Sequence, residues 1–105
     1  MADTHYLKTW PQYFEHVRKR TKKFEYRKND RDFKFGDTVV LQEWNPERPY
    51  LDKVPGPLGP PMGYTGETEI FKIGYIFHIP DSDYVIFSLL EHSINSSNLA
   101  SKGEA

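Results

Sequence analysis

Six prolines and three glycines crowd residues 45–63, and this stretch constrains the fold of the 105-residue chain more than any other feature. Proline has no backbone N–H and a fixed φ, so neither a helix nor a ladder of paired strands runs through such a segment. Regular structure must therefore form before residue 45 and after residue 63. Loops longer than about 12–15 residues are uncommon in compact domains and are usually functional or mobile. We expect a long loop here that is ordered only in part.

Strand-forming residues flank this loop on both sides. Residues 38–44 precede it and begin with Thr-Val-Val. Residues 68–79 and 84–90 follow it and are rich in Ile, Phe and Tyr. Such residues are enriched in β-strands. Because the last run is apolar on both faces, we expect a central strand that is buried from either side. Gly74 within the middle run predicts a bulge or a bend.

The first part of the chain predicts one helix between two further strands. Residues 5–8 alternate as a short strand does, and Pro11 then marks the first turn of a helix that extends to about residue 20. The expected buried stripe of this helix comprises Tyr13, Phe14 and Val17. Residues 22–28 alternate between aromatic and charged side chains, the period of a half-buried strand. Together these elements predict an α+β fold, a small and strongly curved sheet or barrel of about five to six strands, rather than a parallel α/β sheet.

Length and composition indicate one compact domain over residues 1–92, followed by a polar tail, residues 93–105, that cannot bury much surface. The chain contains no cysteine, which excludes disulfides and thiolate chemistry and favours an intracellular protein. No apolar run approaches the roughly 20 residues of a membrane helix, and the first residues lack the order of a signal peptide. We therefore expect a cytoplasmic monomer without membrane contact.

Charge is distributed unevenly along the chain. Residues 18–34 contain nine Lys and Arg against three acids, a net charge of +6, although the whole chain has a net charge of -1. A basic patch of this density is typical of a surface that binds a phosphate backbone. The alternative is a solvated helix end followed by an exposed strand face, and composition alone favours neither.

Cofactor and metal chemistry find no support in the sequence. The four histidines lack the spacing of a helical zinc site, and we expect surface or capping positions for all of them: His5, His16, His78 and His92. No phosphate-binding glycine loop, dinucleotide fingerprint or Ser-His-Asp arrangement occurs. We predict neither a cofactor nor a metal.

The run RTKKFEYRKNDRDFKFGD, residues 20–37, resembles the ASCH (activating signal cointegrator homology) domains, which are relatives of the PUA RNA-binding fold. It is most similar to an uncharacterised bacterial and phage subfamily with the pattern Arg-Lys-Asn-Asp-Arg-Asp-Phe-x-x-Gly-Asp. Further matching segments are His5-x-Leu7-Lys8, Glu43-Trp44-x-Pro46 and Gly63-Tyr64-Thr65-Gly66. The resemblance covers roughly residues 5–90. It implies a PUA-like β-barrel with one helix after the first strand, and recognition of RNA or a modified nucleoside.

Two features depart from the ASCH pattern. The family usually has glycine two residues before its motif lysine, where this chain has Arg20. The proline-rich stretch from about residue 47 to residue 62 is an insertion relative to the subfamily loop, so no role is transferred to it.

The resemblance and the side-chain chemistry together predict a nucleic-acid site. A glutamate accepts hydrogen bonds from exocyclic amines, and an arginine offers a bidentate fork to a phosphate or a base edge. The predicted site residues are Lys22, Glu25, Arg27, Lys28 and Arg31, with Lys19 and Lys23 adding charge, and Tyr50 and Tyr64 stacking bases. Because Lys22 and Glu25 are an odd number of residues apart, a shared site needs a bulge or turn between them. The alternative is an exposed cross-strand ion pair between Glu25 and the neighbours of Arg27, which would contribute little.

Catalysis is the second hypothesis. A similar class of ASCH protein hydrolyses N4-acetylcytidine with a lysine, a threonine three residues later and a glutamate from a later strand. Here Lys22 matches the lysine but Glu25 occupies the threonine position, and a carboxylate cannot act as the hydroxyl nucleophile without forming a labile anhydride. Thr21 would face away from Lys22 on a strand. We therefore favour binding over a nucleoside amidohydrolase that uses Lys22 and Glu25, and keep a protein-interaction module as a third hypothesis.

Overall fold

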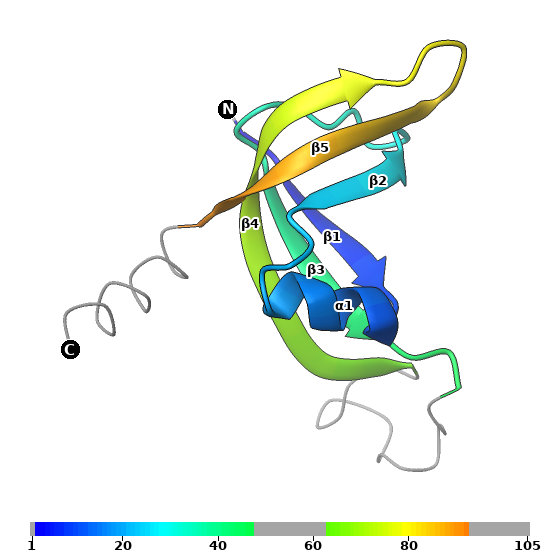
Figure 1. Ribbon diagram of the computed structural model, residues 1–105, viewed down its shortest axis with the longest axis vertical. Helices are drawn as coiled ribbons and strands as arrows, with labels where there is room; N and C mark the ends of the chain where they lie inside the picture. The colour runs from blue at the N-terminus through cyan, green and yellow to red at the C-terminus, as the bar shows by residue number, and fades with distance from the viewer. Residues whose placement is uncertain (1, 48–62, 93–105) are drawn as a thin grey trace, which may run out of the picture. The chain divides into compact units, whose positions relative to one another are not determined.

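The computed structural model describes residues 2–47 and 63–92, in which one helix and five strands form (Figure 1). In chain order they are β1 (Thr4–Thr9), α1 (Pro11–Arg18), β2 (Phe24–Lys28), β3 (Thr38–Trp44), β4 (Tyr64–His78) and β5 (Tyr84–Glu91). The strands belong to one sheet with the order β1-β3-β4-β5-β2. Most of the predicted loop, with Tyr50, and the predicted tail lie outside the described residues.

The predicted mostly-β architecture with one early helix is confirmed, with five strands in one sheet among the described residues. β5 pairs with both β2 and β4, and both pairs are antiparallel. This pairing agrees with the exclusion of a parallel α/β sheet. No helix among residues 2–47 and 63–92 is long and apolar enough to cross a membrane.

The described residues fall into two compact units. The first unit comprises residues 2–5, 23–40 and 70–92, and the second comprises residues 6–22, 41–47 and 63–69. Each unit is assembled from segments that are distant in sequence.

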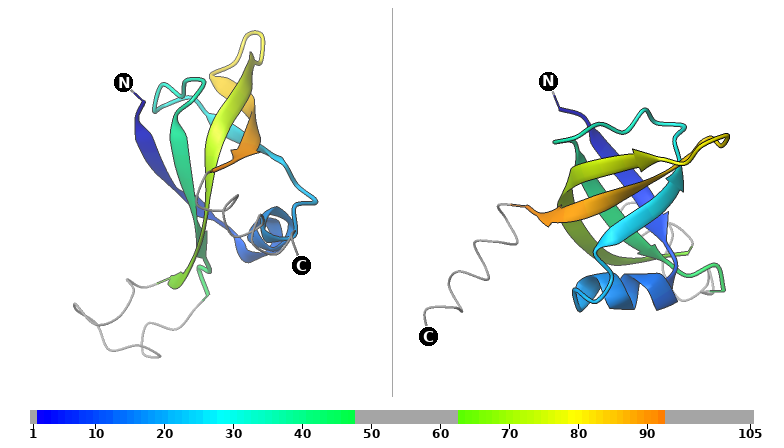
Figure 2. Two further views of the ribbon diagram at one scale, coloured as in Figure 1. Left: turned by 90° about the vertical axis from the view of Figure 1, so that its left-hand side faces the viewer. Right: turned by 45° about the horizontal axis from the view of Figure 1, so that its top comes forward.

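In the first unit, β5 lies between β4 and β2 (Figure 2). The prediction of a central strand is confirmed, but the prediction that both of its faces are buried is wrong. Val85, Phe87 and Leu89 are buried, whereas Tyr84 and Leu90 are exposed. An antiparallel sheet packs one face on the core and leaves the other to solvent, so the apolar outer residues here remain accessible.

The bend expected at Gly74 is present as a register shift between Ile73 and Ile76 in the β4–β5 pair. A Cβ at Gly74 would lie 2.3 Å from Ser88 Oγ, so a larger residue does not fit there. Ser88 Oγ accepts a hydrogen bond of 3.0 Å from the backbone N–H of Tyr75. The Ser88 side chain on β5 thereby provides an acceptor for a backbone N–H of β4 at the register shift.

In the second unit, α1 begins at Pro11 directly after Trp10, as predicted. Phe14 and Val17 are buried, but Tyr13 is exposed, because only these two side chains of the eight-residue helix face the core. The expected stripe is therefore narrower than predicted. Trp10 also contacts Trp44 edge to face, with ring centroids 6.2 Å apart.

Arg20 stands after α1 in a backbone conformation that usually favours glycine. Its φ is +65°, a left-handed conformation that glycine adopts freely and that costs other residues about 1–2 kcal/mol. The guanidinium offsets part of this cost, because Nη1 donates to the carbonyls of Val17 (3.2 Å) and Arg18 (3.1 Å) and to Glu69 Oε1 (3.1 Å).

Candidate functional site

The alternation predicted for β2 is observed, but its charged side faces the core of the first unit. Phe24 and Tyr26 are 46% and 55% exposed, whereas Glu25 is only 3% exposed. The register places Glu25 opposite Phe87 and Arg27 opposite Val85, both of which are buried. Residues directly opposite each other share a face of the sheet. The inner face of β2 therefore presents a carboxylate and a guanidinium beside apolar side chains.

Glu25 and Arg27 form an ion pair on this inner face. Arg27 Nε donates to Glu25 Oε1 over 2.8 Å, and the side chains are 25% and 4% exposed, respectively. The exposed position expected for Glu25 in the alternative is thus wrong, because its place opposite Phe87 withdraws it from solvent, and its partner Arg27 lies on the same strand. Hydrogen bonds and charges act more strongly in such surroundings than in water.

Aromatic ring contacts connect this pair to a second buried polar contact, between His5 and Asp37. The ring centroid of Phe33 lies 5.0 Å from that of Phe87, the residue opposite Glu25. It lies 4.8 Å from the centroid of the His5 ring. His5 Nε2 lies 2.8 Å from Asp37 Oδ2. The expected surface or capping position is therefore wrong for His5, since Asp37 compensates its burial.

Asp37 is tied to three neighbours. Oδ1 accepts from the Asp3 N–H (3.0 Å), and Oδ2 accepts from the Lys34 N–H (3.1 Å) as well as contacting His5. Burial alone would raise the pKa of Asp37, but the hydrogen bonds from His5 and from the two backbone N–H groups lower the pKa below its ordinary value. The carboxylate thereby holds the turn that ends at Gly36, whose φ is +89°.

Ligand atoms of Asp3, His5 and Asp37 lie within 4.8 Å of one another, which is the spacing of a metal site. The Asp37 oxygens already accept the hydrogen bonds described above. We therefore assign this cluster to the stability of the first unit rather than to metal binding.

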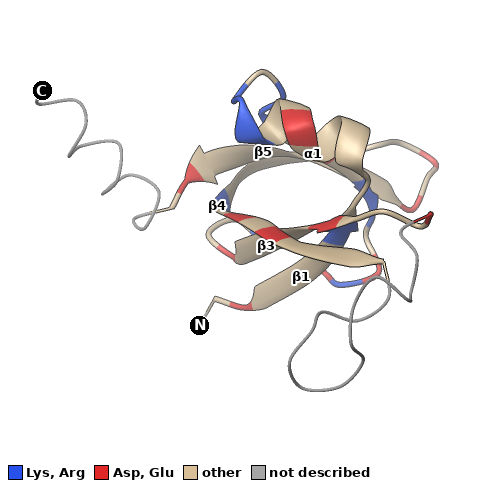
Figure 3. Cartoon of the chain, turned by 90° about the horizontal axis from the view of Figure 1, so that it is seen from below, with Lys and Arg blue, Asp and Glu red and all other residues tan. Residues whose placement is uncertain are grey.

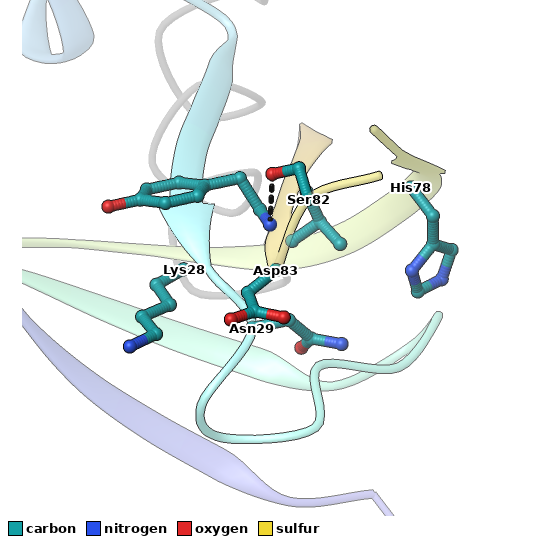
Figure 4. Close-up of a pocket in the computed structure, with 7 residues that line it drawn as sticks. Lys28, Asn29, His78, Ser82 and Asp83 are labelled. Atoms are coloured by element: carbon teal, nitrogen blue, oxygen red, sulfur yellow. Dashed lines mark hydrogen bonds between the residues drawn. The ribbon is translucent and has the colours of Figure 1, made fainter. Parts of the chain in front are cut away.

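A polar cavity of about 350 Å³ lies where β2 and β5 meet the β4–β5 turn (Figure 4). Its lining residues are Lys28, Asn29, His78, Ser82, Asp83, Tyr84 and Val85. The Asn29 N–H donates to the Asp83 carbonyl (2.7 Å), and the Tyr84 N–H donates to Ser82 Oγ (2.9 Å). The cavity combines cationic and anionic groups, so it suits a small polar group better than a free anion.

The remaining predicted residues are distributed over both units. In the first unit, Lys28 lines the cavity, Lys23 is exposed, and Arg31 Nε lies 4.0 Å from Asp30 Oδ1. In the second unit, Lys19 pairs with Glu15 over 3.1 Å, and both Lys22 and Tyr64 are half-buried. Of the predicted residues, the structure thus pairs Glu25 with Arg27 on the inner face of β2, while Lys28 lies on the outer face of the same strand.

The basic segment after α1 is visible in Figure 3. Within it, the Thr21 hydroxyl is engaged at the end of the helix. Its Oγ1 lies 2.9 Å from His16 Nδ1 and 3.1 Å from the His16 carbonyl oxygen. His16 therefore has the exposed, helix-end position expected of it, and the Thr21 hydroxyl serves to close the last turn of the helix.

A family described as a domain of unknown function, DUF3850, matches residues 4–89 of the chain. The chain belongs to the DUF3850 family. It is also 43% identical over 44 residues to an uncharacterised 12.9 kDa protein in the GpA 3′ region of Escherichia phage P2, a match that covers 42% of this chain and 40% of the phage protein. Membership in ASCH or a PUA-like fold is not part of these matches and stays a prediction.

Sequence reasoning missed two features of this DUF3850 domain. One is the buried His5–Asp37 pair, for which the Gly36-Asp37 turn was a partial signal, since an aspartate after a glycine turn commonly accepts backbone hydrogen bonds. The other is the solvent exposure of Phe24 and Tyr26. The alternation of β2 could not reveal it, because a period of two does not state which face is buried.

Proposed function

We propose that this DUF3850 domain is a PUA-like module that binds RNA or a modified nucleoside, with Glu25 and Arg27 recognising the base. The observation that carries the proposal is the Glu25–Arg27 ion pair on the core-facing side of β2. A charged pair in that position requires a reason beyond stability, because well-packed apolar residues in place of a buried ion pair are often equally or more stabilising.

The pair matches the chemistry of a nucleobase edge. A glutamate carboxylate accepts hydrogen bonds from an exocyclic amine such as that of cytosine, and a guanidinium donates to carbonyl and ring-nitrogen acceptors. Phe87 and Val85 opposite the pair are buried, so the apolar core closes the space behind it, and the partly exposed guanidinium of Arg27 is the side of the pair that a base reaches first. A nucleobase edge therefore matches the donors and acceptors of the pair.

The surrounding cations suit the phosphates of an RNA strand. Lys23 and Arg31 belong to the same unit as the pair, Lys28 projects from the opposite face of β2, and Lys19 and Lys22, which belong to the second unit, stay predicted contacts. If about three or four phosphates of a single strand are neutralised, the log–log dependence of affinity on salt has a slope of about -2 to -3.

Calorimetric titration with free nucleosides, including cytidine and N4-acetylcytidine, tests the proposal. We expect Glu25→Gln to change the preference among nucleosides and to weaken the best one by about tenfold, since one good base contact corresponds to about 1–3 kcal/mol. Glu67→Gln is the matched control, because it removes a carboxylate that pairs with Arg18 at an exposed position in the second unit. Its binding should equal that of the wild type.

Two results would overturn the proposal. One is the absence of nucleoside or RNA binding by the folded wild-type protein, or a salt slope near zero. The other is the release of acetate from N4-acetylcytidine that disappears in Lys22→Ala, which would establish the amidohydrolase alternative instead.

A further inference from the structure

The outer face of β2, β5 and β4 carries an exposed group of aromatic and aliphatic side chains, here called the aromatic face. The register pairs Tyr26 with Ile86 and Ile86 with Phe77, which forms one row across the three strands. Neighbouring rows pair Lys28 with Tyr84, Phe24 with Ser88, and Lys72 with Leu90. Paired residues lie on the same side of a sheet, opposite to the Glu25–Arg27 pair.

The large side chains of this face are accessible to solvent. Tyr84 is 39% exposed, and Phe77 and Leu90 are each 47% exposed, in addition to the two exposed rings of β2. Tyr26 and Tyr84 stack on each other with ring centroids 5.0 Å apart and an interplanar angle of 21°. Contiguous apolar surface of this kind on a folded domain usually marks a binding site.

Both charged residues that the register places on the aromatic face are lysines, Lys28 and Lys72. Asp83 lies beside the face, where it lines the polar cavity together with Lys28 and Tyr84 (Figure 4). The aromatic face therefore carries positive charge, and Asp83 lies at its margin. This arrangement favours a partner with regularly spaced negative groups, such as phosphates.

We propose that the aromatic face binds single-stranded nucleic acid by stacking two or three successive bases, with Lys28 and Lys72 beside the phosphates. The inference rests on the proposed function for the nature of the ligand, but it assigns a second surface on the side of the sheet opposite to Glu25. Strands about 4.8 Å apart give the row Tyr26–Ile86–Phe77 a width of about two strand spacings, which suits a few stacked bases. Exposed rings on a sheet with flanking cations are the usual platform for unpaired bases.

A second copy of the chain fits this face less well. In a two-fold symmetric contact the same patch meets itself, so the interface would contain four lysines, Lys28 and Lys72 from each copy. Like charges at an interface oppose association. Single-stranded nucleic acid has the complementary charge and a stackable surface on every unit.

Fluorescence anisotropy with a labelled ten-nucleotide oligo(U) tests the platform. Tyr26→Ala and Phe77→Ala should each weaken binding by about 5- to 100-fold, the range for one lost base stack. Tyr13→Ala is the matched control, since Tyr13 is a similarly exposed tyrosine on α1 in the second unit, and it should bind as the wild type does. Lys28→Gln, which keeps the rings, should reduce the magnitude of the salt slope by about 0.7.

The outcomes separate this inference from the proposed function. If the platform is correct, Tyr26→Ala leaves the binding of free nucleosides at the wild-type level while oligonucleotide affinity falls, whereas Glu25→Gln alters nucleoside binding. Equal oligonucleotide affinity of Tyr26→Ala, Phe77→Ala and the wild type overturns the platform, even if nucleosides still bind. A wild-type dimer in sedimentation that Tyr26→Ala converts to a monomer, without a change in oligonucleotide affinity, assigns the face to self-association and also overturns it.

Discussion

Two buried carboxylates of the first unit, Asp37 and Glu25, are held in different ways. Asp37 is 2% exposed and joins Asp3, His5 and Lys34 through two backbone N–H groups and an imidazole. Glu25 is equally withdrawn from solvent, but it meets the guanidinium of Arg27, two residues along the same strand. The Asp37 contacts connect segments distant in sequence, whereas the Glu25–Arg27 contact is local to β2.

This difference indicates different roles. A carboxylate that satisfies backbone donors from separate segments defines the path of the chain, so its removal disturbs the fold. A charged pair between neighbours on one strand contributes little to the path of the chain and brings a desolvation cost. We therefore assign Asp37 to stability and Glu25 to recognition, and the following experiments test that division.

The largest effect is expected for Asp37→Ala. The substitution leaves the Asp3 and Lys34 N–H groups and His5 without their acceptor, and we expect a loss of about 3–5 kcal/mol in the free energy of unfolding. Urea unfolding followed by circular dichroism measures it. Asp30→Ala is the control, because Asp30 is an exposed turn residue and should cost less than about 0.5 kcal/mol. Similar losses for both variants would contradict the role assigned to Asp37.

The next effect concerns the recognition pair. Arg27→Leu leaves the Glu25 carboxylate without this guanidinium, and we expect a loss of about 3 kcal/mol, at the lower end for buried pairs because Arg27 is partly exposed. The double variant Glu25→Leu/Arg27→Leu should recover to within about 1 kcal/mol of the wild type or exceed it. Urea unfolding midpoints measure both.

The matched control for this cycle is Lys19→Gln, which removes the exposed pair with Glu15 and should leave the unfolding midpoint close to that of the wild type. A double variant that is stable but no longer binds nucleosides would show that the pair is kept for binding. A double variant as unstable as Arg27→Leu would instead make Glu25 a structural residue like Asp37.

The smallest effect is expected in how the free energy of unfolding changes at acidic pH. The folded-state pKa of Asp37 is lowered from its ordinary value of 3.8, so its contribution is fully present above that value and is lost as the pH falls through the lower folded-state pKa. The stability difference between the wild type and Asp37→Asn should therefore shrink on acidification from about pH 6 to about pH 2.5. Unfolding midpoints across this range measure it, and a difference that grows on acidification would contradict the assignment.

Local sequence patterns predicted structure correctly where a residue type has a single structural consequence. Pro11 begins α1, the β-branched run 38–44 is β3 at its predicted bounds, and Gly74 marks the irregularity in β4. The left-handed turn after α1 was less predictable. Arg20 adopts it only with hydrogen bonds from its guanidinium, one of which reaches Glu69, a partner 49 residues later in the chain.

The sequence by itself determined the strands, the single helix, the alternation of β2 and the choice of Glu25 and Arg27 as residues of interest. Only the tertiary structure decided which face of β2 is inside, and hence that the ion pair is shielded while Phe24 and Tyr26 meet solvent. The same holds for His5 and Asp37, whose contact joins positions 32 residues apart. The physical reason is that periodicity is a property of neighbours along the chain, whereas burial depends on which strand lies opposite, here β5 with Phe87 and Val85 on its inner side.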